Sequence, residues 1–265
     1  NAELGRSSAS LSGLSEVENV FGEPNPDGIA NALTKFFDSW SGLASNPGDK
    51  AARMSVRAAG ITLTDRVRGA YQQLQNLEDQ QTQRATDTIR QINSLGQTVQ
   101  RLNQEIQHNT VTGAEASDLL DQRDQAIAEL NRLVKVSTVE QRDGSTSVFI
   151  GSGQSLVMGN RAKQLELGDQ LDENGRSMIT VRANSGVVEP LAESLVGGGT
   201  LGGLLAARRE GTASAQRSLG LLATTLATEF NSQHALGLDL EGRLGGDFFK
   251  IGGVRVDPSD SGLSV

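Results

Sequence analysis

Hydrophobic and polar positions follow a helical period over most of the first half of the chain. Between residues 49 and 108 there is no proline, and small or aliphatic side chains return every three or four positions. In the second half of this stretch a spacing of 3, 4, 3 and 4 lays one apolar seam along a helix. The seam residues are Ile92, Leu95, Val99, Leu102 and Ile106. The pattern predicts one long helix, about 49–108, which would span roughly 90 Å at 1.5 Å per residue.

The seam is less apolar toward the start of this helix. Leu74 and Leu77 begin a similar repeat, but Gln81, Ala85 and Thr88 occupy the next seam positions before the apolar run resumes. The apolar seam therefore weakens along this part of the helix.

Three further stretches supply partners for the long helix. A short amphipathic helix, about 29–45, carries an aromatic cluster around Phe36. A return helix, about 114–134, follows Thr112-Gly113-Ala114-Glu115, which has the spacing of a capping box. A late helix, within 197–240, ends near Gly237, a candidate C-cap glycine. Together these helices predict an antiparallel bundle.

The pattern changes to a strand-like one between the return helix and the late helix. Asp143-Gly144 is a tight-turn dipeptide between two such runs, and Gly151-Ser152-Gly153 indicates a second turn. The candidate strands are 136–141, 147–150, 155–158, 162–167 and 178–182. Residues 248–251 and 254–256 suggest a strand that begins a further β domain.

The predicted fold class is mainly α with a small β part. We interpret the chain as an elongated antiparallel helical bundle or coiled coil with an inserted, irregular β-hairpin unit. The predicted divisions are a helical rod (1–135), a small β-hairpin unit (136–196), a late helix that returns to the rod (197–240) and the start of a truncated outer β domain (241–265).

Composition and charge exclude several classes of function. The chain has a formal charge of −8, and its basic residues are scattered among acids, so we expect no nucleic acid partner. Only 36% of the residues are hydrophobic and 3% aromatic, which is lean for a globular enzyme. There is no cysteine, so disulfides and thiolate metal sites are impossible. No apolar run approaches the roughly 20 residues that span a bilayer, so we expect no membrane partner.

Acidic and histidine side chains are the first candidates for chemistry. Asp118, Asp121 and Asp124 recur every three residues on the predicted return helix, where two of them could pair as carboxylates or hold a cation. A solvated acidic face near a helix start, which the macrodipole favours, is the simpler interpretation. The only two histidines, His108 and His234, each lie near a predicted helix end, where a surface or capping role suffices.

Two short motifs resemble known sites without completing them. Asp239-Leu240-Glu241-Gly242 resembles the opening of a calcium loop, but the downstream spacing offers Asp247 instead of the required glutamate. Gly151-Ser152-Gly153-Gln154-Ser155 resembles a nucleophile elbow, but Ser155 stands in place of the second glycine. We interpret both as turns. The sequence therefore predicts no enzyme and no catalytic, cofactor-binding or metal site.

Several local sequences together resemble one protein family. They are residues 46–53 (NPGDKAAR), 119–125 (LLDQRDQ) with Glu129-Leu130-Asn131 behind them, 202–208 (GGLLAAR), 230–242 (FNSQHALGLDLEG) and 245–249 (GGDFF). Their order and spacing are similar to those of the bacterial flagellar hook-associated protein 1 (FlgK) family. The resemblance covers about 15–249, and LLDQRD is its most specific motif.

This resemblance implies a secreted structural protein of the bacterial flagellum. Members of the family are exported through the flagellar type III apparatus and form a junction layer between hook and filament. The helical domain is expected to pack against copies of itself in a ring around the flagellar axis, next to the hook protein and the next hook-associated protein. The chain is interpreted as a fragment without the terminal polymerisation segments and without the segment that an export chaperone binds.

Arginine side chains and two rival functions complete the expectations. Bidentate pairing with carboxylates of neighbouring subunits is expected of surface arginines, although simple solvation of each one is as good an interpretation. The arginines to examine are Arg53, Arg66, Arg68, Arg84, Arg90 and Arg101. An extracellular helical adhesin or host-binding module is the alternative function, and Phe149 is the only aromatic residue in its β tip. A cell-wall hydrolase would have to use the row of aspartates.

Overall fold

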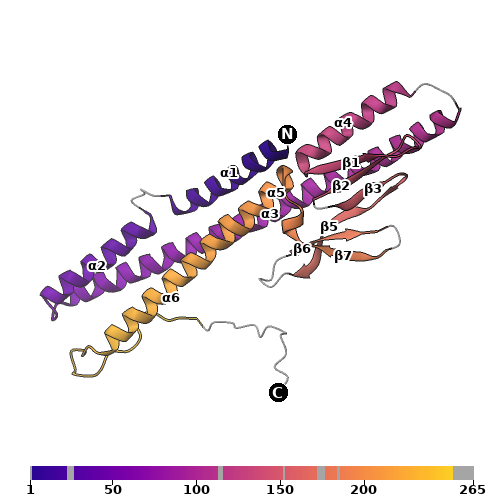
Figure 1. Cartoon of the computed structure of the whole chain (residues 1–265). Helices are drawn as coiled ribbons and strands as arrows, with labels where there is room; N and C mark the ends of the chain where they lie inside the picture. The colour runs from indigo at the N-terminus through magenta and orange to yellow at the C-terminus, as the bar shows by residue number, and fades with distance from the viewer. Residues whose placement is uncertain are drawn as a thin grey trace, which may run out of the picture. The chain divides into compact units, whose positions relative to one another are not determined.

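The computed structural model describes residues 2–22, 27–112, 116–151, 153–171, 177–183 and 186–252 (Figure 1). Its helices are α1 (Ala2–Phe21), α2 (Ile29–Ser45), α3 (Lys50–Thr112), α4 (Ser117–Leu133), α5 (Gly199–Ala206) and α6 (Ala213–Ala235). A π-helical segment, Ala207–Thr212, connects α5 to α6. The predicted fold class, mainly α with a β part inserted between helices, is confirmed. None of the helices in these ranges has the length and apolar character that crossing a bilayer requires.

Contacts between residues divide the chain into two compact units. The first unit comprises Asn1–Glu23 and Gln72–Ala215, and the second comprises Pro24–Tyr71 and Gln216–Val265. The boundaries between the units fall inside α3, after Tyr71, and near the start of α6, after Ala215.

The apolar seam of α3 lies in the core of the first unit. Ile92, Val99, Leu102 and Ile106 are at most 2% exposed, as the periodicity predicts. The same core contains Leu130 of α4 and the inward-facing residues of the strands. Ile92 and Val99 of the seam therefore share one core with α4 and the strands.

In the described residues of the first unit, seven strands form two antiparallel sheets. The strands are β1 (Val136–Glu140), β2 (Thr146–Ile150), β3 (Gln154–Met158), β4 (Arg161–Ala162), β5 (Gln164–Leu171), β6 (Ser177–Arg182) and β7 (Val188–Leu191). The sheet orders are β1-β2-β3-β4 and β5-β6-β7. The two predicted turns are confirmed: Gly144 (φ +82°) lies between β1 and β2, and Gly151 (φ +57°) and Gly153 lie between β2 and β3.

Two asparagines on α3 bind the backbone of the β part. The Asn93 amide donates to the Leu165 carbonyl and accepts from the Leu165 N–H, both at 2.8 Å. Asn103, fully buried, donates to the carbonyls of Thr146 (2.9 Å) and Gly159 (2.8 Å) and accepts from the Thr146 N–H (3.0 Å). These bonds fix the position of both sheets along the helix.

We expect Asn103→Ala to lower the free energy of unfolding of the first unit by about 2 kcal/mol. The substitution leaves buried main-chain groups of Thr146 and Gly159 without this partner, and each unsatisfied group carries a desolvation cost. Urea unfolding followed by circular dichroism measures the change. Gln104→Ala, on the exposed side of the same helix, should shift stability by less than about 0.5 kcal/mol; equal effects for the two variants would contradict the anchoring role.

Helix α1 was not predicted from the sequence. Its residues are rich in serine and glycine and carry no continuous apolar stripe. It packs on α5, the π-helical segment and α4 through very close approaches of small residues. A Cβ added at Gly13 would lie 2.4 Å from the Ala207 Cβ, and one added at Gly203 would lie 2.4 Å from the Arg6 carbonyl oxygen. Small size, not hydrophobicity, allows this contact.

The polar section of the α3 seam is buried in the same region. Gln81 is 1% exposed, and its Oε1 accepts a hydrogen bond from the Thr212 hydroxyl of the π-helical segment at 3.0 Å. Its Nε2 would lie 3.4 Å from a Cβ added at Gly13 of α1. The weakened section of the seam is therefore buried, and it turns polar where it meets Thr212.

The core of the second unit is aromatic. Phe36 of α2 is fully buried among Phe37, Trp40, Phe230, Phe248 and Phe249, with ring centroids 5.1–6.3 Å from its own. Asn231 of α6 pins the last two: its Oδ1 accepts from the N–H groups of Phe248 and Phe249, both at 2.9 Å, and its Nδ2 donates to the Phe249 carbonyl. This core sets the course of residues 247–250.

The role predicted for Thr112, the first residue of a capping box for the return helix, is wrong. Thr112 is the last residue of α3, and its hydroxyl donates to the carbonyls of His108 and Asn109. The N-cap of α4 is Ala116, without a side-chain cap; the remainder of the proposed capping box, 113–115, lies outside the described residues. Residues 248–251, predicted as a strand, do not form one; the isolated bridge of Leu238 with Leu244 precedes them. The predicted strand at 254–256 lies outside the described residues.

Candidate functional site

The row of aspartates on α4 faces solvent. Asp118, Asp121 and Asp124 are all exposed, and none of them lines either of the two hollows described below. The buried face of the helix is instead formed by Arg123, Ala126 and Leu130. Arg123 is 4% exposed and donates from Nη1 to the Gly144 carbonyl at 2.8 Å, so it ties α4 to the β1–β2 turn. The simpler interpretation, a solvated acidic face, agrees with this arrangement.

The two histidines belong to different units and lie in different environments. His108 is exposed on α3 in the first unit. His234 of α6 lies against Trp40, Phe230 and Phe248, and its Nδ1 is 2.6 Å from the Gly246 carbonyl oxygen. Among the residues with described positions, no group of three His, Asp or Glu side chains could hold a metal ion.

A hairpin of residues 236–246, which we call the leucine hairpin, follows α6. Its two arms are joined by Leu238 pairing with Leu244, by Asp239 N–H to the Arg243 carbonyl (2.8 Å) and by Gly245 N–H to the Gly237 carbonyl (2.9 Å). Four leucine side chains are exposed on it. They are Leu236 (74%), Leu238 (66%), Leu240 (59%) and Leu244 (73%).

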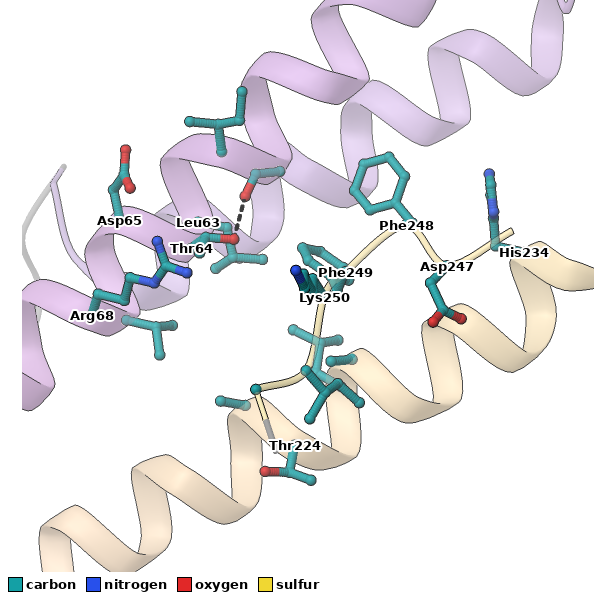
Figure 2. Close-up of a pocket in the computed structure, with 18 of the residues that line it drawn as sticks. Leu63, Thr64, Asp65, Arg68, Thr224, His234, Asp247, Phe248, Phe249 and Lys250 are labelled. Atoms are coloured by element: carbon teal, nitrogen blue, oxygen red, sulfur yellow. Dashed lines mark hydrogen bonds between the residues drawn. The ribbon is translucent and has the colours of Figure 1, made fainter. Parts of the chain in front are cut away.

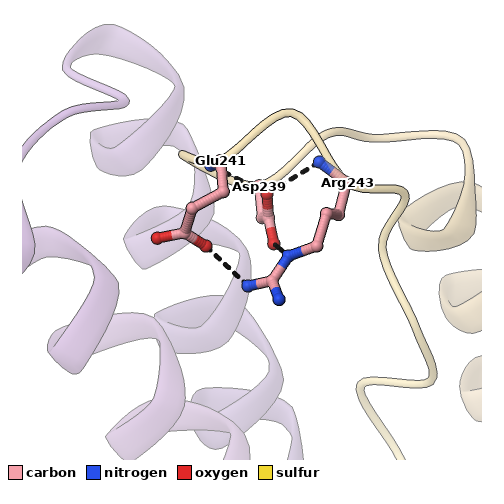
Figure 3. Close-up of polar contacts among 3 residues, drawn as sticks. All are labelled: Asp239, Glu241 and Arg243. Carbon is pink, nitrogen blue, oxygen red and sulfur yellow. Dashed lines mark hydrogen bonds and ion pairs between the residues drawn. The ribbon is translucent and has the colours of Figure 1, made fainter.

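Asp239 holds the turn of the leucine hairpin together (Figure 3). Its carboxylate accepts from the N–H groups of Glu241 (2.9 Å) and Arg243 (2.8 Å) and from Nε of Arg243 (2.9 Å). Arg243 Nη2 also donates to Glu241 at 2.6 Å. Gly242, at φ +77°, takes the left-handed position that the turn requires. The prediction of a turn here is confirmed, and the Asp239 oxygens that a calcium loop would use are occupied by protein donors.

The bonds to Asp239 make the hairpin sensitive to pH. The Arg243 backbone N–H, the Arg243 side chain and the Glu241 N–H hold the pKa of Asp239 below its ordinary value of 3.8. A lowered pKa stabilises the hairpin at every pH above the ordinary value, and this stabilisation is lost as the pH falls through the folded-state pKa.

We expect Asp239→Asn to open the hairpin at neutral pH, because the amide loses the charge that strengthens these bonds. The measurement is the protection of the Glu241 and Arg243 amide protons by NMR, taken as their exchange rate relative to an unstructured peptide at the same pH. Protection should fall in Asp239→Asn at pH 7 and in the parent chain only at strongly acidic pH. Glu241→Gln, which removes one exposed charge from the same turn, should leave the Arg243 amide protected. Equal protection in parent and Asp239→Asn would refute the role of Asp239.

A groove of about 840 Å³ lies in the second unit between α3 and α6 (Figure 2). Asp247 to Lys250 run between the two helices, and Gly60 leaves room for Phe248, since a Cβ there would lie 2.8 Å from the ring. The apolar lining includes Ile61, Val67, Ala223, Leu226 and Ala227. The charged lining consists of Arg57, Arg68 and Lys250 with Asp65 and Asp247. A second hollow, lined in the first unit by α1, Arg132 and Thr200, carries no such cluster of charges.

The arginines singled out in the sequence are mostly engaged within the chain. Arg53 donates to the Pro47 carbonyl from Nε (3.1 Å) and Nη2 (2.8 Å). The ion pairs are Arg66 with Asp27, Arg84 with Glu16, Arg90 with Asp87 and Arg101 with Glu105. Arg68 differs, because it lines the groove and no salt bridge is described for it.

Sequence reasoning missed both the groove and the leucine hairpin as surfaces. The groove joins residues some 160 positions apart (Ile61 and Ala223), which no local pattern reveals. The signal for the hairpin in the sequence is a set of leucines at 236, 238, 240 and 244, on both sides of a turn motif, with few other apolar residues nearby.

Comparison with known proteins gives one consistent result. Residues 14–249 match the family described as the flagellar hook-associated protein FlgK helical domain. The chain is 34% identical over 246 residues to flagellar hook-associated protein 1 of Salmonella typhimurium, which covers 92% of this chain and 44% of that protein. The protein of the same name from Bacillus subtilis is 26% identical, over 93% of this chain and 53% of that protein.

The fold is also similar to a solved structure. The flagellar hook junction protein FlgK from Burkholderia pseudomallei superposes with a TM-score of 0.83 at 33% identity, over 94% of this chain and 46% of that one. The chain thus spans about half the length of the relatives that it matches.

Proposed function

The chain belongs to the family of flagellar hook-associated protein FlgK helical domains, and from this we propose that the protein containing it forms a layer of the junction between hook and filament. In this role it is a structural subunit, exported by the type III route and located outside the cell at the base of the filament. Its partners are copies of itself around the flagellar axis, the hook protein on one side and the next hook-associated protein on the other.

One observation carries the proposal: the residues of the family-like motifs serve the fold, not chemistry. In 46–53, Asp49 accepts from the Ala51 N–H (2.8 Å) at the start of α3, and Arg53 bonds back to Pro47. In 119–125, buried Arg123 binds the β1–β2 turn. In 230–242, Asn231 and Asp239 fix the aromatic segment and the leucine hairpin.

This use of polar motif residues supports a structural role over an enzymatic one. A catalytic site brings polar groups together in a cleft and leaves them able to reach a substrate. Here Asp49, Arg123 and Asn231 are engaged with the backbone, and the exposed aspartates of α4 line neither of the two hollows described above. We propose no catalytic activity for this chain.

The location of the full-length protein tests the proposal. The chain has no cysteine, so Asn160→Cys, in the exposed turn before β4, gives one thiol in it for a membrane-impermeant maleimide dye on intact cells. One spot at the proximal end of each filament, absent from cells carrying the unsubstituted gene, is the expected result. Label spread over the cell surface would favour the adhesin, and the absence of surface label on flagellated cells would refute the junction role.

A further inference from the structure

The leucine hairpin is an ordered apolar surface without a described partner. Its four leucines are each at least 59% exposed, while the backbone beneath them is fixed by the pairing of Leu238 with Leu244 and by the three bonds to Asp239. A preorganised loop loses less conformational freedom on binding than a mobile one. Ordered, clustered apolar side chains of this kind mark interaction sites.

The groove of the same unit has the complementary character. Its walls are apolar, with Ile61 51% exposed, and none of the four leucines of the leucine hairpin lines it. Its charged lining has three cations, Arg57, Arg68 and Lys250, against two acids, Asp65 and Asp247. The hairpin has the opposite balance, two acids, Asp239 and Glu241, against Arg243. In the described part of the chain, no salt bridge joins Arg57, Arg68 or Lys250 to an acid.

We propose that the leucine hairpin of one copy docks into the groove of a second copy of this chain. The opposite charge balance of the two surfaces favours this occupant, and the exposed leucines fill the apolar walls. Two different patches meet, so the contact is heterologous and each copy offers one hairpin and one groove, which lets the contact repeat from copy to copy. The inference rests on the proposed junction function, in which copies lie side by side.

Cysteine cross-linking tests the contact directly, because the chain contains no cysteine. Purified Leu240→Cys chain is mixed with Ile61→Cys chain and treated with a short bis-maleimide. The matched control is Gln97→Cys, exposed on α3 but not part of the groove. We expect at least tenfold more mixed dimer with Ile61→Cys than with Gln97→Cys. Equal yields would overturn the proposal.

Charge exchange provides the second measurement. Arg68→Glu, made in the chain that carries Ile61→Cys in its groove, should reduce the dimer yield at least threefold, since it removes one of the three cations that line the groove. Glu241→Arg in the hairpin chain should restore the dimer yield with the Arg68→Glu groove chain. Mixed instead with a groove chain that keeps Arg68, the Glu241→Arg chain should give a lower yield. Dimer yields that change with neither the Arg68→Glu nor the Glu241→Arg substitution would contradict the proposed charge complementarity.

The full-length protein separates failure of this inference from failure of the proposed function. Cells producing the Leu240→Cys, Ile61→Cys double variant are treated with the cross-linker, and flagella are isolated. A ladder of cross-linked oligomers supports docking. Monomer alone, in flagella that contain the protein, overturns the docking contact and leaves the junction role standing. Flagella without the protein would refute the junction role itself.

Discussion

Gly203→Ala should lower the free energy of unfolding of the first unit by about 3 kcal/mol and release α1 from α5. The added Cβ would lie 2.4 Å from the Arg6 carbonyl oxygen and 2.7 Å from the Ala9 Cβ. The first atom belongs to the α1 backbone, and the second is the Cβ of an alanine, so no rotamer change relieves the clash. Overpacking of a rigid site of this kind costs roughly 1–3 kcal/mol, and the loss of α1 packing adds to it.

Gly220→Ala is the matched control for this prediction. Gly220 lies inside α6, and a Cβ there meets no atom within 4 Å. Alanine in a helix is favoured over glycine by about 0.5–1 kcal/mol, so this variant should be as stable as the parent or more so. Hydrogen exchange then locates the effect: α1 amides should lose protection in Gly203→Ala only. Unchanged α1 protection would show that the close α1–α5 contact is absent in solution.

The seam and the turns illustrate what a sequence determines locally. Ile92, Val99 and Leu102 repeat at the helical period and are buried, and Gly144 and Gly151 occur at turns where φ is positive. In both cases the physical cause lies within a few residues, so periodicity and turn chemistry suffice to predict the structure.

Helix α1 and the buried polar groups illustrate what a sequence leaves open. Gly13 and Gly203 matter because another backbone approaches them, and the identity of that backbone depends on the fold. Asn103 and Gln81 occupy positions that look solvated or weak in the sequence, yet each bonds to a residue more than 40 positions away. The groove is likewise formed by α3, α6 and residues 247–250, which Asn231 holds in place. Contacts of this range carry no periodic signal.

Phe36→Ala should unfold the second unit selectively, at a cost of about 3–5 kcal/mol. Phe36 is fully buried, and its ring lies 5.1 Å from that of Phe230, 5.5 Å from that of Phe249 and 5.7 Å from that of Phe248. Removing it leaves a cavity where α2, α6 and the segment after the leucine hairpin converge. Because Asn231 and this cluster together position residues 247–250, the groove should be lost with the core.

The single tryptophan reports this change without any label. Trp40 belongs to the cluster, with its ring 6.3 Å from Phe36 and 5.1 Å from Phe230, so its fluorescence should shift to the red in Phe36→Ala. Phe37→Ala is the matched control: it removes the same ring type from the neighbouring, 46% exposed position of α2 and should cost much less. Amides of the first unit, such as that of Leu165, should keep their protection from exchange. Loss of protection in both units at once would mean that they unfold cooperatively, and an unshifted emission would mean that the aromatic core does not depend on Phe36.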